Sequence, residues 1–186
     1  MSEPYTLIRS RRRTLAVTVD SEGTVVVRAP RLCPREEIDR FVAARGDWIA
    51  DRRKKRLAQS AAAQAAGVLS EEALAALKTR GKAVFSERTA YFAGRLGVDY
   101  GRITVRAQKS RWGSCSREGN LSFNCLLLLA PPEVLDSVVV HELCHRRQMN
   151  HSARFYAEVY RVMPDYDRRA KWLKEHGGAL QMRLPR

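Results

Sequence analysis

The chain has 186 residues, of which 45% are hydrophobic and 29% charged, and its formal net charge is +14. These values exclude an intrinsically disordered chain and indicate a globular protein, most simply a single domain over residues 1–186. The basic charge predicts attraction to polyanions such as nucleic acid or nucleotides, although a solvated basic surface explains the same charge.

The sequence also bears on the compartment of the protein. The apolar runs at 126–129 and 138–140 are too short to span a membrane. Residues 1–5 lack the cationic start and apolar core of a signal peptide. No Cys-x-x-Cys pair occurs among the four cysteines, which are Cys33, Cys115, Cys125 and Cys144. We therefore expect reduced thiols, a cytoplasmic location and no membrane partner.

The first predicted elements are a β-hairpin and a helix. Alternating and β-branched residues over 7–19 and 24–29 flank a turn signal at 20–23, which predicts two paired strands. Pro34 is then expected to begin a helix that continues to about Arg56.

The middle of the chain is predicted to contain a second helix and two strands. The alanine-rich segment 58–67 either extends the preceding helix or forms a loose linker, and Gly67 is expected to end it. Ser70 is expected to cap the second helix, whose apolar residues continue to Leu96. Short strands are expected over 103–106 and 121–128, with a loop between them.

The last third of the chain is predicted to be helical. Pro131-Pro132 suits the first turn of a helix whose apolar residues cover most of its circumference, so this helix should be buried. Ser152 is expected to cap the next helix, and residues 165–176 to form the last one, closed by glycines at 177–178. The predicted fold class is α+β, with a small antiparallel β-sheet packed on helices.

Three of the four histidines lie close together at the end of the buried helix. His141 and His145 are one helical turn apart on one face, which is the spacing at which two imidazoles can share a tetrahedral metal. Glu142 lies roughly 100° around the helix from His141 and could reach a water molecule on the open side of that metal. His151 could return as a third ligand. Three protein ligands with a fourth position for water describe a catalytic zinc site. The alternative is an amphipathic helix with exposed polar residues.

The segment between His145 and His151 must end the helix and reverse the chain. Many zinc proteases with this spacing have glycine three residues after the second histidine, where this chain has Gln148. Asn150 is therefore the predicted turn residue, because asparagine tolerates a left-handed backbone. Cys144 is interpreted as a small buried hydrophobe and not as a ligand.

The chain resembles the YgjP-like metallopeptidase family, a group of small zincins related to the SprT-like and WLM proteases. The resemblance rests on residues 9–12, 27–30, 111–116, 128–132, 139–143 and 149–152. It implies that His141, His145 and His151 are zinc ligands and that Glu142 is the general base. It also implies a zincin-like core over residues 70–178, in which the His-Glu-x-x-His helix is followed by a C-terminal helix pair. Residues 1–57 precede this core as a hairpin and helix, and 58–69 connect the two.

These observations predict a zinc-dependent metallohydrolase, with a peptidase favoured, in which Glu142 activates a zinc-bound water. Some family members carry the name UTP pyrophosphatase, so nucleotide hydrolysis is one alternative, with Lys109 and Arg111 binding the phosphates. No Walker-type loop supports it. A DNA-associated, SprT-like or WLM-like protease is the second alternative; the +14 charge fits it, but no DNA-reading motif is present. A non-enzymatic zinc module is disfavoured, because it would leave Glu142 without a purpose.

In each enzymatic alternative, Lys109 and Arg111 are the candidate substrate-binding residues, because they place positive charge near the metal. Glu158 could orient a ligand imidazole, or it could be a solvated surface residue. The sequence offers four candidates for stabilising an oxyanion and favours none of them: Tyr156, Tyr160, Tyr166 and His176.

Overall fold

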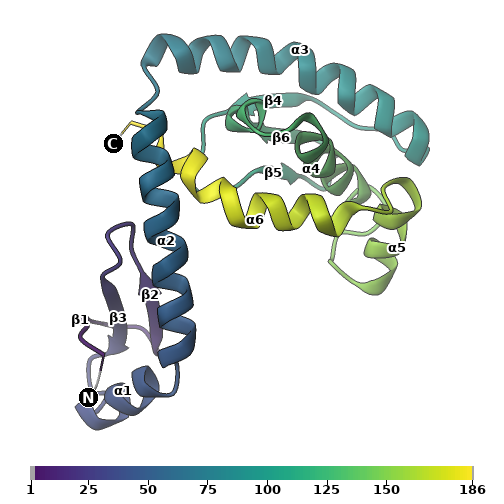
Figure 1. The fold of residues 1–186 in the computed structure, drawn as a ribbon. Coiled ribbons are helices and arrows are strands. Elements are labelled where there is room, and N and C mark those ends of the chain that lie inside the picture. Colours follow the sequence, from purple (N-terminus) through teal and green to yellow (C-terminus); the bar gives the residue numbers. More distant parts are fainter. Residues whose placement is uncertain (1–2, 186) are drawn as a thin grey trace. The chain divides into compact units, whose positions relative to one another are not determined.

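The computed structural model describes residues 3–185, which form helices and two three-stranded β-sheets (Figure 1). The predicted α+β class is confirmed. The chain divides into two compact units, Met1–Ala66 and Gly67–Arg186. The single domain expected from the sequence stays a prediction, and so do the boundaries expected inside it. In the described part of the chain, no helix is both long enough and apolar enough to cross a bilayer.

The N-terminal unit contains a sheet of three strands, β1 (Thr6–Ser10), β2 (Ala16–Val19) and β3 (Val25–Pro30), in the order β1-β3-β2. The β2–β3 pair is the predicted antiparallel hairpin, and the Asp20 carboxylate accepts two backbone hydrogen bonds of 2.9 Å at its turn. Strand β1 pairs with β3 in parallel. The extended segment predicted over 7–19 is therefore interrupted between β1 and β2.

Two helices complete this unit, α1 (Arg35–Ala43) and α2 (Gly46–Ala66). The prediction of one helix over 34–56 is wrong. In a straight helix Ile38 and Ile49 would lie about 16 Å apart along the axis, whereas the break brings both into one small core on the sheet. The alanine-rich segment continues α2, so the first of its two predicted alternatives is correct.

The C-terminal unit begins with the long helix α3 (Glu71–Leu96). The Ser70 hydroxyl accepts a 3.1 Å hydrogen bond from the N–H of Ala73, as predicted for an N-cap. Gly97 ends the helix in the left-handed region, with φ of 66°, where a side chain would be strained.

A second sheet of three strands follows, β4 (Ile103–Arg106), β5 (Gly113–Cys115) and β6 (Leu121–Asn124), in the order β4-β6-β5. Strand β6 is parallel to β4 and antiparallel to β5. The prediction of an antiparallel sheet is therefore wrong in this detail, since both sheets are mixed. Strands β4 and β5 are neighbours in the sequence but not in the sheet, because β6 inserts between them.

The strand predicted over 121–128 is shorter in the structure. It ends at Asn124, and the 3₁₀ helix η1 (Cys125–Leu129) takes the place of its second half. The buried Asn124 side chain accepts a hydrogen bond from the start of η1. Its amide donates to the carbonyls of Gln108 and Arg111, at 2.7 and 2.9 Å. One buried asparagine thus ends the strand and anchors the preceding loop.

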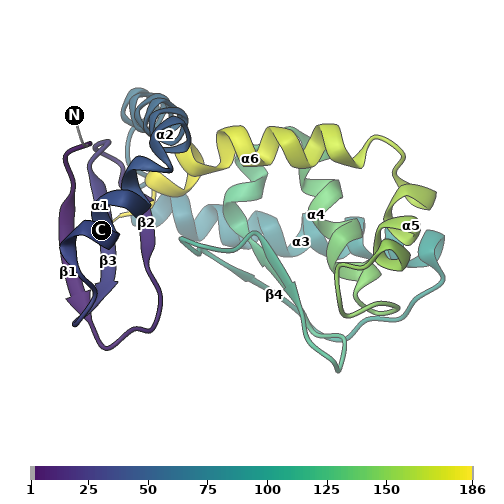
Figure 2. The same cartoon turned by 90° about the horizontal axis from the view of Figure 1, so that it is seen from below.

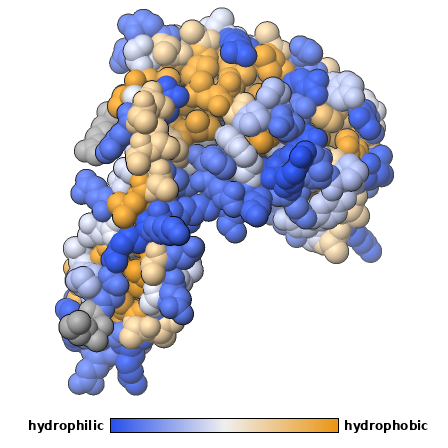
Figure 3. All heavy atoms as spheres, viewed as in Figure 1, coloured by the Kyte–Doolittle hydropathy of each residue, from blue (hydrophilic) through white to orange (hydrophobic). Residues whose placement is uncertain are grey.

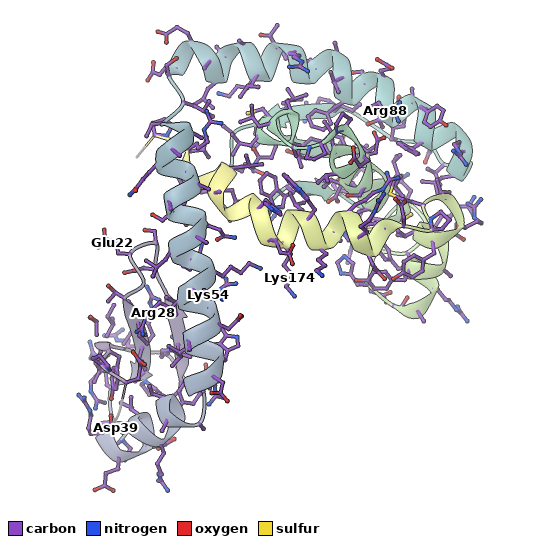
Figure 4. All side chains as sticks on the ribbon, viewed as in Figure 1. Glu22, Arg28, Asp39, Lys54, Arg88 and Lys174 are labelled. Atoms are coloured by element: carbon purple, nitrogen blue, oxygen red, sulfur yellow. The ribbon has the colours of Figure 1, made fainter. Side chains whose placement is uncertain are left out.

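Helix α4 (Pro132–Cys144) lies between α3 and α6 (Tyr166–Met182), and most of its residues are buried (Figure 1 and Figure 2). With α5 (Ala153–Val162), α6 forms the predicted C-terminal helix pair. The Arg88 guanidinium of α3, labelled in Figure 4, donates hydrogen bonds of 2.7 and 2.8 Å to the two carboxylate oxygens of Asp136 in α4.

The prediction that glycines at 177–178 close the last helix is wrong, because α6 continues to Met182. A Cβ atom at Gly177 would lie 2.6 Å from Cζ2 of Trp112. The glycine therefore permits close packing of α6 on the indole ring and does not end the helix. Helix α6 also exposes Lys171 and Lys174, and Figure 3 shows a mostly hydrophilic surface over this helix.

The close contact between Gly177 and Trp112 can be tested by a pair of glycine substitutions. Gly177→Ala should lower the free energy of unfolding by about 1–2 kcal/mol, because overpacking outweighs the gain in helix propensity. Gly94→Ala is the matched control in α3, where an added Cβ meets nothing within 4 Å. It should raise stability by about 0.5–1 kcal/mol. Urea denaturation of both variants measures the difference, and equal stabilisation by both would contradict the packing argument.

Candidate metal centre

The three histidines singled out by their spacing converge in the structure. One ring nitrogen from each of His141, His145 and His151 lies within 4.8 Å of the others. His141 lies in the last turn of α4, His145 at its C-cap, and His151 in the segment before α5. The Nε2 atoms of His141 and His151 are 2.9 Å apart. Three nitrogen donors at such separations could hold one metal ion.

His141 is held from behind by a tyrosine. Its Nδ1 lies 2.8 Å from the hydroxyl of Tyr166, the first residue of α6. Burial, followed by the neighbouring His145 and His151, lowers the pKa of His141 to about 4. The imidazole is therefore neutral at physiological pH, which is the form that binds metals. A metal on Nε2 would leave the proton on Nδ1, which then donates to the tyrosine oxygen.

The backbone fixes the tautomer of His145. Its Nδ1 lies 3.0 Å from the carbonyl oxygen of Gln148, and a carbonyl can only accept a hydrogen bond. The proton is therefore on Nδ1, and the lone pair of Nε2 is free to bind a metal. Burial is the main cause that lowers the pKa of this imidazole.

The turn after His145 differs from the one predicted. The N–H groups of Arg147 and Gln148 both donate to the carbonyl of Cys144 at 3.0 Å, so the helix ends in right-handed turns. Among the described residues no non-glycine residue has a positive φ, and the prediction of a left-handed Asn150 is wrong. The turn needs no glycine because it contains no left-handed residue. It also places the Gln148 carbonyl against the His145 ring.

The two arginines after the motif tie this turn to other parts of the C-terminal unit. Arg147 donates at 2.6 Å to the carbonyl of Leu96, the last residue of α3. Arg146 bonds the carboxylate of Asp99 and the carbonyl of Arg117, at 3.0 and 2.9 Å. Both guanidinium groups are used in these contacts.

Glu158 contacts arginines and not a ligand imidazole. Its carboxylate oxygens lie 3.6 Å from Arg147 and 3.0 Å from Arg161. Of the two interpretations drawn from the sequence, orientation of a histidine is not what the structure shows. The carboxylate instead links α5 to the turn that follows His145.

The Glu142 side chain lies against the backbone of β5. Only 6% of this residue is exposed, and burial raises the pKa of its carboxyl to about 7. A Cβ atom added to Gly113 would lie 2.5 Å from Oε1 of Glu142. Glycine at this position of the strand therefore makes room for the carboxylate.

A cleft of about 360 Å³ opens beside His141 and Glu142. Its walls come from α4, from α6 and from the segment that leads into β5. Of the two residues predicted to bind substrate, Arg111 lies on this wall, whereas Lys109 is exposed and is not part of the wall. The remaining lining residues are Trp112, Gly113, Ser137, Val138, Tyr166, Ala170, Leu173 and Lys174.

The sequence alone does not single out Lys174, and it leaves the role of Tyr166 open. Both residues belong to α6, and the cleft-lining positions 166, 170, 173 and 174 follow helical spacing. This spacing could identify them only together with the knowledge that α6 packs beside the histidine motif. Of the four oxyanion candidates only Tyr166 lines the cleft. Tyr160 instead bonds Asp167, and His176 stacks on Trp172.

The profile of the YgjP-like family, metallopeptidase domain, matches residues 13–76 and 69–176. These matches cover most of the chain, which therefore belongs to the YgjP-like metallopeptidase family. The histidines that converge in the structure lie inside the second matched segment.

Two solved structures show a partial likeness to the chain. The metallopeptidase zymogen of Pyrococcus abyssi abylysin is 20% identical with a TM-score of 0.44, over 48% of this chain and 92% of that one. The metallopeptidase zymogen of Methanocaldococcus jannaschii jannalysin is 18% identical with a TM-score of 0.43, over 48% and 93%. No curated protein matches the chain significantly.

The contact between Tyr166 and His141 predicts a specific effect on metal affinity. Tyr166→Phe removes the hydroxyl that holds Nδ1, and the affinity for Zn²⁺, used as a probe, should fall by about 10- to 100-fold. Competition with a chromophoric chelator measures this change. Tyr160→Phe is the control, because that hydroxyl bonds Asp167 and no candidate ligand. Equal affinities of the two variants would show that Tyr166 does not support the site.

Proposed function

We propose that the protein is a zinc-dependent metallopeptidase in which His141, His145 and His151 bind the metal and Glu142 is the general base. The observation that carries the proposal is the convergence of three imidazoles, one of which, His141, lines a cleft together with the buried carboxylate of Glu142. Membership of a metallopeptidase family supports hydrolysis of peptide bonds as the reaction.

The donor set fits zinc better than a hard oxygen-binding cation. The metal-ligand group found among the described residues consists of three imidazoles, and zinc commonly takes three protein nitrogens in catalytic sites. Cys144, next to His145, is not part of this group, and burial raises the pKa of its thiol to about 12. A thiol held neutral in this way is a poor ligand.

The residues around the cleft have different roles in the proposed reaction. Zinc, when bound, supplies a Lewis acid that acidifies water and polarises a carbonyl oxygen. Glu142 faces the cleft beside His141, where its carboxylate can take a proton from water and deliver it to the leaving amine. Tyr166 holds the ring of His141, and Gly113 leaves the space in which the carboxylate lies.

The alternatives are less well supported by the cleft. A nucleoside triphosphate needs several donors for its charged oxygens, but the cleft has two basic side chains, Arg111 and Lys174, and a largely apolar wall. Lys109, expected to share the phosphates, does not line it. Binding of nucleic acid through the basic surface, and kinship with SprT-like proteases on DNA, stay proposals that salt-sensitive DNA binding would test. The four free cysteines support our proposal of a cytoplasmic location.

The proposal predicts that metal binding and turnover can be separated by a single substitution. The purified protein should contain one zinc per chain. Glu142→Gln should retain it while losing peptide hydrolysis by at least about 10²-fold, because the general base is removed. Glu133→Gln, at an exposed position in the first turn of the same helix, is the control and should remain active.

Elemental analysis and cleavage of casein and of peptide mixtures provide the measurements. If the protein hydrolyses UTP but no peptide, and Glu142→Gln abolishes the hydrolysis of UTP, the peptidase proposal is overturned in favour of nucleotide hydrolysis. Failure of the protein to bind zinc stoichiometrically would overturn the metal site itself.

A further inference from the structure

The cleft beside His141 has a mainly apolar interior. Trp112, Val138 and Leu173 supply its large side chains. Ser137 is also part of the wall, but its hydroxyl donates a 2.7 Å hydrogen bond to the carbonyl of Val134 in the same helix. It therefore presents little unsatisfied polarity. An apolar side chain of a ligand would lose contact with water here without losing hydrogen bonds.

The walls of this cleft are held in place before any ligand binds. Trp112 packs on Gly177 of α6, and its carbonyl accepts a 2.9 Å hydrogen bond from the N–H of Asn124. The Asn124 side chain holds the carbonyl of Arg111 at 2.9 Å. The segment that carries Arg111 and Trp112 is thus fixed by one buried asparagine, which favours selective binding.

Two basic side chains, Arg111 and Lys174, lie on the wall of the cleft. In residues 3–185 neither the Arg111 guanidinium nor the Lys174 ammonium forms a hydrogen bond or an ion pair with another described residue. Other arginines of this unit are paired: Arg88 with Asp136, and Arg169 with Asp165. Lys174 extends from α6 (Figure 4), and Arg111 comes from the segment before β5. The two charges are therefore available to an anionic group of a ligand.

We propose that this cleft is a specificity pocket for peptides that carry an apolar side chain beside the scissile bond and a carboxylate on the same side of that bond. Trp112, Val138 and Leu173 receive the apolar side chain, and Arg111 and Lys174 bind the carboxylate. The carboxylate comes from an Asp or Glu side chain or from the C-terminus of the peptide. This inference rests on the proposed peptidase function.

The experiment is a cleavage profile of a peptide mixture with free C-termini, read by mass spectrometry. With the zinc-loaded protein, cleaved bonds should have an apolar residue on one side. Peptides with a carboxylate on that side should be cleaved with kcat/KM about tenfold or more above matched peptides with an amide. Matched pairs with Glu or Gln, and with a free or amidated C-terminus, distinguish the two sources of the carboxylate.

Four variants assign the preference to residues. Arg111→Gln and Lys174→Gln should each reduce the ratio of kcat/KM for carboxylate peptides to kcat/KM for the matched amide peptides toward one. Lys109→Gln and Lys171→Gln remove exposed charges from the same loop and the same helix, but neither residue lines the cleft. Both should keep the wild-type preference. A purely general effect of positive charge would affect all four variants alike.

The outcomes separate this inference from the proposed function. Cleavage of peptides without preference for a carboxylate, or a preference lost equally in the control variants, would overturn the pocket and leave the peptidase intact. Absence of cleavage of every peptide by a protein with stoichiometric zinc would overturn both. Binding of UTP that requires Arg111 and Lys174, together with no binding of peptides to the zinc-loaded Glu142→Gln protein, would assign the cleft to a nucleotide instead.

Discussion

Burial of α4 is the constraint on which the rest of the site depends. The helix packs against α3, α5, α6 and strand β5, so its rotation about its own axis is fixed from several sides. The orientation of the helix places His141 beside His145 and His151, and it places Glu142 against Gly113. The same burial keeps the imidazole of His141 neutral, because a charged ring would be poorly solvated there. A buried helix whose last turn reaches a cleft therefore places a candidate metal ligand, His141, and a buried carboxylate, Glu142, side by side.

Close approaches of backbone and side chain explain several small or polar residues around this helix. Gly113 and Gly177 occur where a Cβ atom would collide with Glu142 and with Trp112. Asn124 ends strand β6, and its side-chain amide donates hydrogen bonds to the carbonyls of Gln108 and Arg111 in the loop beside the cleft. Arg147 attaches the turn after His145 to the end of α3. These residues contact the histidines only indirectly, yet they fix the segments from which the histidines and the cleft wall are built.

The parts of the structure that the sequence predicts are those set by local chemistry. The spacing of His141, His145 and His151, the cap at Ser70 and the proline start of α4 follow from the geometry of a helix and its ends, and the structure agrees with them. The resemblance to the YgjP-like family is confirmed by the family profile.

The predictions that are wrong concern features set by contacts distant in the sequence. The sequence predicts a helix stop at the glycine pair 177–178, but Gly177 permits packing on Trp112, which is 65 positions earlier. The position of β6 between β4 and β5 cannot be predicted from the residues of any one of these strands. Lys174 could not be assigned to the cleft until α6 was known to face α4. In each case the missing information was which elements pack together.

X-ray absorption at the zinc edge of the purified, metal-loaded protein tests our proposal that three imidazoles of this chain bind one catalytic zinc ion. We predict one zinc per chain, with three imidazole nitrogens at about 2.0–2.1 Å and one further oxygen ligand. A zinc–sulfur distance of about 2.3 Å, which would bring Cys144 or another thiol into the site, would contradict it.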